Sequence, residues 1–379
     1  MTDLLRTRPW TTPAMLAVFA DAAVIGHALA FEAALARAEA AENVIPATVA
    51  TEIARACATL EIDACALADE AALAGTLAIP LVARLRAVLS DTAAASVHKG
   101  ATSQDLADTV LMLQARAATR LLLADLDRTT AALAALAMRH AATPAIGRTL
   151  LQDALPVGFG LRIAQWHAGI ADAARRLRGE VGHCTVQFGG AAGTRAGLAG
   201  CGPQIAARIA GELGLAVGEP WHARRGDIAA LASALAIVIG ALAKMARDIS
   251  LLAQNGVGEA REPAVAGRGG SSAMAHKRNP TGCQVALSAA LRAPGLIASI
   301  FAGLPQEEER GLGGWQAEGP ALADLFLLAA GAAEALAGVA EGLEIDEAAI
   351  ARNLAGAGMG TDIGESVTIV DALLARSKG

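Results

Sequence analysis

A glycine-rich segment followed by two serines and several cations is the part of this sequence best suited to chemistry. It reads Gly-Arg-Gly-Gly-Ser-Ser-Ala-Met-Ala-His-Lys-Arg-Asn-Pro over residues 267–280. Glycines let backbone N–H groups approach a ligand closely. A serine hydroxyl becomes a useful acid or base only where nearby donors and cations stabilise its alkoxide. Lys277 does not have the spacing of a phosphate-binding P-loop. From residue types alone, the segment is either a proton-transferring loop or a flexible Gly/Ser connector.

A second polar segment, residues 98–105, contains His98, Thr102 and Ser103 and precedes a long helical pattern. Hydroxyl side chains at such a position cap the helix. The free N–H groups of a helix start also attract a carboxylate. The segment is therefore a helix cap that could also bind an anionic substrate.

Four more polar segments occur between the helical patterns. Residues 147–156 contain Arg148 and Gln152, and the glycine-rich residues 187–194 begin with Gln187. Residues 220–225 end with Arg225, and residues 305–310 end with Arg310. By composition alone, 187–194 could be only a turn, and Trp221 and His222 could belong to the core or to an interface.

In order along the chain, these six segments resemble the signature blocks of the fumarase/aspartase superfamily. Residues 270–280 are similar to its Gly-Ser-Ser-x-Met-Pro-x-Lys-x-Asn-Pro pattern, with a departure at Ala275. Residues 98–105 resemble its His-x-Gly-x-Thr-Ser-x-Asp block. Within the superfamily the chain most resembles the 3-carboxy-cis,cis-muconate cycloisomerases. That narrower resemblance lies in residues 31–40, 100–105, 187–191, 220–222 and 305–307.

The resemblance implies an intramolecular lyase of the isomerase class, which closes 3-carboxy-cis,cis-muconate to 4-carboxymuconolactone in protocatechuate breakdown by the β-ketoadipate pathway. It implies a small tricarboxylate substrate, no metal or organic cofactor, and a homotetramer whose active sites combine loops of three subunits. We expect Ser271, or failing that Ser272, to transfer the carbon-bound proton. Lys277 would stabilise the developing charge, and His98 would be an auxiliary acid or hydrogen-bond donor. The expected substrate-binding residues are Thr102, Ser103, Arg148, Gln152, Gln187, Arg225, Asn279 and Arg310.

Asp153 departs from the pattern, because the superfamily has a histidine there. In lactone opening the leaving group is a carboxylate with a pKa of about 4 in water, so little protonation is needed. We therefore hypothesise that a cycloisomerase tolerates the loss of an acid at this position. An ionised Asp153 would repel a trianionic substrate unless it points away or pairs with an arginine such as Arg148. Gly311, where some relatives have a serine, is a second departure.

Two other functions stay open. One is an adenylosuccinate- or argininosuccinate-type lyase, which releases fumarate. The other is a catalytically silent binding or structural protein with the same fold. Asp153, Ala275 and Gly311 keep the silent protein open, whereas the intact serine-containing segment 271–279 argues against it.

The composition indicates what kind of scaffold must hold these segments. Of 379 residues, 54% are hydrophobic but only 3% are aromatic, so alanine and leucine must fill the core. Both are strong helix formers, which predicts an all-α fold. A net charge of −6 argues against a nucleic-acid surface. Five scattered cysteines without zinc spacing indicate reduced thiols and a cytoplasmic protein. The apolar residues 229–243 are too few for a membrane span and predict a buried helix.

Five long helical patterns predict a central bundle over residues 104–345. The clearest pattern extends from Asp227, a candidate cap, to about residue 256, with apolar residues spaced alternately by four and three. Others start at 104 or cover 155–178, 282–303 and 317–341. Residues 1–103 predict a smaller N-terminal domain of short helices, and residues 346–379 predict a short C-terminal helical segment. We expect no strands, since neither a convincing alternation nor an Asn-Gly hairpin signal occurs.

Overall fold

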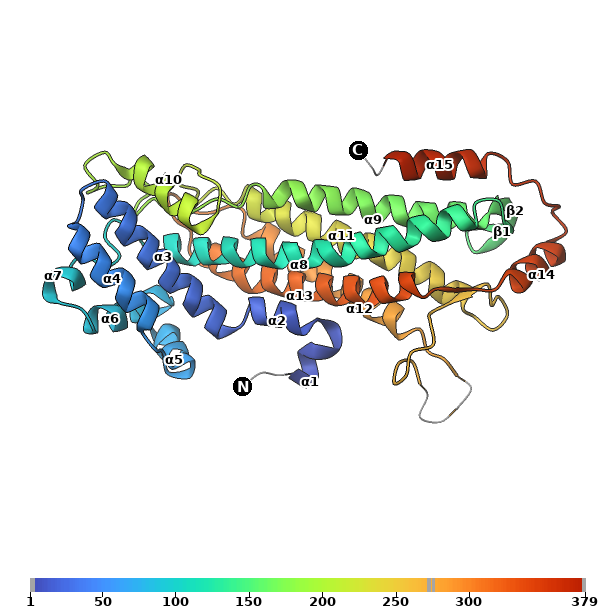
Figure 1. Cartoon of the computed structure of the whole chain (residues 1–379), viewed down its shortest axis with the longest axis horizontal. Helices are drawn as coiled ribbons and strands as arrows, with labels where there is room; N and C mark the ends of the chain where they lie inside the picture. Colours follow the sequence, from blue (N-terminus) through green and yellow to red (C-terminus); the bar gives the residue numbers. More distant parts are fainter. Residues whose placement is uncertain (1–3, 271–273, 275–276, 377–379) are drawn as a thin grey trace.

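The computed structural model describes residues 4–270, 274 and 277–376. Five long helices lie side by side and give the molecule its elongated shape (Figure 1). They are α8 (Ser103–Arg139), α9 (Phe159–Val181), α11 (Gly226–Leu252), α12 (Thr281–Ala302) and α13 (Gly314–Glu341). The predicted all-α fold with a long central bundle is confirmed.

Helix α11 shows why these segments form a bundle. Its apolar residues recur every three or four positions and form one buried stripe, which consists of Leu231, Leu235, Val238, Leu242, Met245, Ile249 and Leu252. Such a stripe is stable only against other helices, and α9, α12 and α13 all pack on α11. The cap prediction is wrong by two residues, because Arg225 precedes the helix and Asp227 lies in its first turn.

Helix α8 sets the distance between the two ends of the bundle. It has 37 residues, which at 1.5 Å per residue corresponds to about 55 Å. Thr102 is its N-cap residue, as expected for a hydroxyl at this position. Three of its polar side chains, Gln104, Asp108 and Thr119, are buried.

The N-terminal residues form short helices of two kinds. The helices α1 (Leu4–Thr7), η1 (Arg8–Trp10) and α2 (Pro13–Val18) come first, and η1 and α2 contact the bundle at α13. The others gather at one end of the bundle (Figure 1). They are α3 (Asp21–Ala41), α4 (Ala47–Thr59), α5 (Ala64–Ala74), α6 (Ala78–Ala87) and α7 (Asp91–Ala94). Helix α10 (Gly202–Leu213) packs against α3 at the same end.

A β-hairpin at the opposite end corrects the prediction that the chain has no strands. Strands β1 (Pro144–Thr149) and β2 (Gln152–Gly158) pair antiparallel, and α9 starts at Phe159 rather than at 155. The turn between them consists of Leu150 and Leu151, which have φ values of 52° and 63°. A two-residue hairpin turn of type I′ needs positive φ at both positions, usually supplied by Asn or Gly. Two leucines carry no such signal, so the sequence did not indicate the hairpin.

The C-terminal residues close this same end of the molecule. Strand β3 (Ala260–Arg261) pairs with β4 (Glu344–Ile345) in a short antiparallel ladder. Helix α14 (Glu347–Ala357) contacts β1, and α15 (Ser366–Arg376) lies along α9. The chain therefore turns back toward the middle of the bundle after α14 (Figure 1).

Helices α11, α12 and α13 are each long and apolar enough to cross a membrane, judged by length and composition alone. The whole of α11 is longer than the apolar run 229–243, and its buried stripe confirms the predicted buried helix. In the most apolar windows of α11 and α13, 56% and 72% of the residues are buried inside the structure. In the corresponding window of α12, only 22% of the residues are buried. Helix α12 thus presents an apolar face to its surroundings, including Leu291 and Phe301.

Candidate active site

The residues predicted to form the site lie in two groups at opposite ends of the bundle. His98, Thr102 and Ser103 are at the start of α8, where Gln187, Arg225 and Arg310 also lie. Arg148 and Gln152 are on the hairpin beyond the far end of α8, at the end where Lys277 and Asn279 lie (Figure 1). Because α8 is about 55 Å long, no small substrate of one chain reaches both groups.

Asp105 organises the first group. Its Oδ1 accepts a hydrogen bond from the backbone N–H of Gly189 at 2.9 Å and lies 2.8 Å from Nε2 of His222. Its Oδ2 accepts from the N–H groups of Thr102 and Gly190, both at 2.9 Å. The side chain is fully buried. Four donors on this one carboxylate hold the 98–105, 187–194 and 220–225 segments together. Because His222 is buried and is one of these donors, it is a core residue.

Asp105 is not among the site residues predicted from the sequence, although a local signal marks it. It is the third residue after the cap, where an acidic side chain returns a hydrogen bond to the backbone of the cap residue. That local signal predicts the contact to Thr102. It does not predict the contacts to residues more than 80 positions away.

His98 follows the end of α7 and has a left-handed backbone, with φ of 60°. Its Nδ1 lies 2.6 Å from Oε1 of Glu32 on α3. Burial disfavours the charged imidazole, but the hydrogen bond and charge of Glu32 and the charge of Asp105 outweigh it. The pKa of His98 is therefore raised above its ordinary value.

Two predicted substrate-binding residues are placed where a substrate does not reach them. Gln187 is fully buried, and its side-chain amide donates to Asp108 and accepts from the N–H of Trp221. Arg225 is also buried, and its guanidinium donates to Asp108 at 2.8 Å and to Glu318 at 2.6 Å. We therefore correct both assignments, because these side chains already have protein partners and support the loops from beneath.

Arg310 lies closer to the surface and joins two of the loops. Its guanidinium donates to the carbonyl oxygens of Gly190 and Ala191 at 3.2 and 2.8 Å. Thr102 and Ser103 are half-buried at the start of α8. This end of the bundle thus presents hydroxyls, an imidazole and a guanidinium on a framework fixed by Asp105.

In the second group, Arg148 is held by carboxylates on two sides. It donates to both oxygens of Glu259, at 2.6 and 3.0 Å, and its Nε lies 3.4 Å from Oδ1 of Asp153. Glu259 is fully buried and also accepts from Asn353 at 2.8 Å. Burial raises the pKa of Glu259, but the arginine and amide contacts outweigh it, so the pKa is lowered. Gln152, by contrast, is exposed at the hairpin tip.

Ser271 and Ser272 lie outside the described residues, and the residues on both sides of them are held to the protein. The backbone N–H of Asn279 donates to the carbonyl of Gly269 at 2.8 Å, and its side-chain amide donates to that of Gly270 at 3.1 Å. Gly269 has φ of +71°, and a Cβ there would lie 2.5 Å from the Asn279 carbonyl oxygen, so only glycine fits. Lys277 is exposed beside a cavity of about 700 Å³ that these residues line.

Glu344 fastens both stems of this loop. Its carboxylate accepts from Nη1 and Nη2 of Arg278 at 3.0 Å each, and from the N–H of Ala264 at 3.1 Å. Glu262 then accepts from the first N–H groups of α12, those of Gly282 and Cys283. Two carboxylates therefore fix the start and the end of the serine-containing segment.

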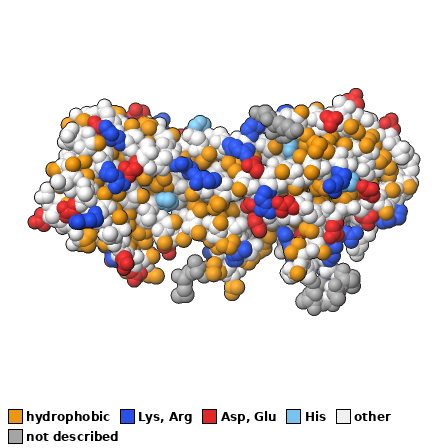
Figure 2. Space-filling model, in the orientation of Figure 1, with side chains coloured by type: hydrophobic (Ala, Val, Ile, Leu, Met, Phe, Trp, Pro, Cys, Tyr) orange, Lys and Arg blue, Asp and Glu red, His pale blue; other side chains and the backbone are white. Residues whose placement is uncertain are grey.

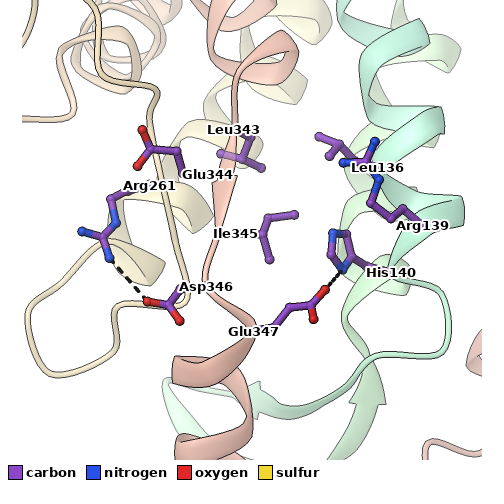
Figure 3. Close-up of a pocket in the computed structure, with 9 residues that line it drawn as sticks. All are labelled: Leu136, Arg139, His140, Arg261, Leu343, Glu344, Ile345, Asp346 and Glu347. Atoms are coloured by element: carbon purple, nitrogen blue, oxygen red, sulfur yellow. Dashed lines mark ion pairs between the residues drawn. The ribbon is translucent and has the colours of Figure 1, made fainter.

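A separate cavity of about 550 Å³ lies between the end of α8, the β3–β4 ladder and α14 (Figure 3). His140 and Glu347 are 3.4 Å apart across it, and Arg261 and Asp346 are 3.7 Å apart. None of these residues belongs to a predicted block, and no local signal marked them. The ion pairs connect three elements, which is a structural role.

Comparison with known proteins agrees with this arrangement. A family model described as a lyase matches residues 8–295. The 3-carboxy-cis,cis-muconate cycloisomerase of Bradyrhizobium diazoefficiens is 49% identical over 91% of this chain and 77% of its own length. That of Pseudomonas aeruginosa is 48% identical over 94% of this chain and 78% of its own.

Solved structures give the same result. The crystal structure of the 3-carboxy-cis,cis-muconate lactonizing enzyme from Pseudomonas putida superimposes with a TM-score of 0.88 and 39% identity, covering 99% of this chain and 88% of that one. Such similarity in sequence and fold over almost the whole chain identifies the family. This chain belongs to the lyase family of the fumarase/aspartase superfamily.

Proposed function

We propose that this protein is a 3-carboxy-cis,cis-muconate cycloisomerase, which forms 4-carboxymuconolactone in protocatechuate breakdown by the β-ketoadipate pathway. The observation that carries the proposal is the 48–49% identity to cycloisomerases over more than nine-tenths of the chain. The two groups of polar residues at the ends of the bundle support it, because both offer donors suited to carboxylates.

In the reaction, an oxygen of one substrate carboxylate forms a bond to a carbon of a C=C bond conjugated with a second carboxylate. The π electrons move toward that second carboxylate, which becomes a dianionic aci-carboxylate. Protonation of the carbon that bears this second carboxylate then restores the ordinary carboxylate. No atom leaves the molecule and one proton is taken up, so the protein must stabilise charge and deliver that proton.

We assign proton delivery to the hydroxyl of Ser271, with Ser272 as the second choice. Lys277 and the amide of Asn279 would stabilise the resulting alkoxide and the developing aci-carboxylate. At the other end of the bundle, the helix start with Thr102 and Ser103, together with His98, would bind the remaining carboxylates.

The separation of the two groups supports an active site shared between subunits. About 55 Å of helix lies between them, so they meet only if the end of one subunit reaches the opposite end of another. The exposed apolar face of α12 supplies a surface for such packing, with Leu291 81% exposed. Hydrophobic side chains are also scattered over the face drawn in Figure 2. We therefore propose a homotetramer with shared sites and, given five unpaired cysteines, a cytoplasmic location.

The proposal is tested by mixing the purified protein with 3-carboxy-cis,cis-muconate and following the loss of absorbance of the conjugated diene. Formation of the lactone at a rate proportional to protein concentration is the expected result. Fumarate release from adenylosuccinate or argininosuccinate, without lactonisation, would identify a lyase instead. A folded protein that turns over none of these substrates would be a silent homologue.

A further inference from the structure

A buried carboxylate holds the histidine of the first polar segment. Oε1 of Glu32, on the inner face of α3, lies 2.6 Å from Nδ1 of His98. The Glu32 side chain has no exposed surface, and its second oxygen has no hydrogen-bond partner among the described residues. One imidazole is thus the main partner of a carboxylate that water does not reach. This makes the pairing strong, because little solvent screens it.

The second ring nitrogen of His98, Nε2, is the atom of the pair that could bind a ligand. Nε2 of His98 has no hydrogen bond within the described part of the chain, and 14% of the side-chain surface stays exposed. A neutral histidine carries its proton on only one nitrogen. A charged one paired at Nδ1 keeps a second N–H, at Nε2, that can donate to a ligand.

The backbone around His98 keeps the ring in this orientation. His98 and Gly100 both have positive φ, and a Cβ on Gly100 would lie 2.6 Å from Leu198. The Gly100 carbonyl in turn lies so close to Gly190 that a Cβ there would be 2.7 Å away. The two loops interlock, and the imidazole has little freedom to turn away from Glu32.

We propose that Glu32 is a positioning residue for catalysis: by holding Nδ1 of His98 it presents Nε2–H as a cationic donor to a substrate carboxylate. This inference rests on the proposed function, since the ligand is one carboxylate of the tricarboxylate substrate. It assigns to α3, outside all six polar segments, a part in the active site.

Several other charged groups act on His98 and enter any pH dependence. Asp105 on α8 favours the charged ring, whereas Arg86 on α6 disfavours it. Lys99, the next residue, binds the carbonyl of Val44, and Glu39 lies further along α3. None of these four groups has a hydrogen bond to the His98 ring among the described residues, whereas Glu32 does. Replacing Glu32 therefore isolates the proposed interaction.

The test compares Glu32→Gln with wild type in the pH profile of kcat/KM for lactonisation. The amide keeps the size of the side chain and a hydrogen-bonding oxygen but removes the charge. We expect the alkaline limb of the profile to move to lower pH by about one unit, because an opposite charge at this distance stabilises the imidazolium. At pH 8 kcat/KM should fall roughly tenfold, and at pH 5.5 it should stay within about threefold of wild type.

Glu61→Gln is the control, since it replaces an exposed carboxylate on another segment that does not touch His98. It should leave the alkaline limb in place. The double variant Glu32→Gln/His98→Gln should be no slower than His98→Gln, because Glu32 is proposed to act only through His98. An unmoved alkaline limb in Glu32→Gln, or an additive loss in the double variant, would overturn the proposal.

A second measurement does not depend on turnover. Diethyl pyrocarbonate modifies neutral imidazoles, and peptide mass spectrometry gives the pH midpoint of modification for each histidine. We expect the His98 midpoint to fall in Glu32→Gln relative to wild type, because the charged ring loses its anionic partner. If Glu32→Gln does not fold, Glu32→Asp, which lengthens the contact but keeps the charge, should show a smaller fall. Equal midpoints for His98 in all variants would refute the pairing, whereas an inactive wild type with the expected midpoints would refute only the cycloisomerase assignment.

Discussion

Arg148 and Asp153 face each other across the β1–β2 hairpin, with Nε of the arginine 3.4 Å from Oδ1 of the aspartate. The same arginine binds buried Glu259. Asp153 stands where the superfamily has a histidine, and its charge is partly compensated by Arg148. This pairing, expected as one possibility from the sequence, explains how an acidic residue is accommodated on a hairpin assigned to binding an anionic substrate.

Restoring the histidine with Asp153→His should change kcat for lactonisation by less than about tenfold. A required general acid typically contributes a hundredfold or more, but a carboxylate leaving group needs little protonation. The rate is measured with 3-carboxy-cis,cis-muconate, and Asp153→Asn separates the loss of charge from the gain of an imidazole. A gain of two orders of magnitude in the histidine variant alone would contradict this account.

Asp105→Asn should destabilise the protein by about 2 to 4 kcal/mol, because a buried carboxylate that accepts from four donors would be replaced by a group that cannot. Loops 98–105 and 187–194 would lose their common anchor, so kcat/KM should fall as well. Thermal denaturation measures the first effect and lactonisation the second. Asp371→Asn, an exposed aspartate on α15, is the control and should behave as wild type. Equal melting temperatures for both variants would show that the hydrogen-bond hub is not important for stability.

Ser271→Ala should reduce lactonisation by at least about a thousandfold and leave the melting temperature within experimental error, since only the proton donor is removed. Ser272→Ala is its matched neighbour and should retain most of the activity. If the larger loss occurs in Ser272→Ala, the roles of the two serines are exchanged. Near-normal turnover in both would end the assignment of this segment to proton transfer.

Two inactive variants should restore activity when they are mixed, if sites are shared between subunits. Ser103→Asp puts a negative charge at the start of α8, which suits a helix N-terminus but repels the substrate. Ser271→Ala removes the proton donor. If the two positions come from different subunits of one site, unfolding and refolding the two variants together should regain roughly a quarter of wild-type activity by random assembly.

The control for that experiment is to refold each variant alone, which should regain no activity. A mixture that stays as inactive as its components would show that each site belongs to one chain. Sedimentation of the refolded mixture checks that the hybrids have assembled.

Glu39→Gln should make the protein more stable at alkaline pH. Glu39 is fully buried, and neither oxygen has a hydrogen-bond partner in the described part of the chain. Burial raises its pKa to about 8, although Lys99 lowers it. In the unfolded chain the group ionises near pH 4.5, so the folded state holds this proton more tightly. The contribution of Glu39 to stability is therefore lost as pH rises from about 4.5 to 8.

Denaturation at pH 5 and at pH 8.5 measures this effect. The glutamine variant should match wild type at pH 5 and exceed it by on the order of 2 kcal/mol at pH 8.5. Glu61→Gln, an exposed residue, should show no such pH-dependent difference. A constant difference between Glu39→Gln and wild type at both pH values would mean that the carboxyl is not protonated in the folded protein at neutral pH.

The sequence by itself determined the helices and the superfamily. Alanine and leucine at spacings of three and four, as in Leu231 to Leu252 of α11, require a buried helical stripe, and this is local information. The polar segments are also local, since a glycine-rich loop or a capped helix start uses neighbouring residues. Hence the bundle and the resemblance to a lyase family could both be predicted.

Only the tertiary structure decided which side chains meet. Arg225 and Gln187 look like substrate-binding residues in the sequence, but packing places them beneath the loops with Asp108. Glu32 looks like an ordinary residue of an alanine-rich helix, but packing places it against His98. The hairpin turn at Leu150 and Leu151 and the separation of the two polar groups by α8 were equally hidden. Periodicity describes one segment at a time, whereas burial, pairing and charge stabilisation depend on contacts between segments far apart in the chain.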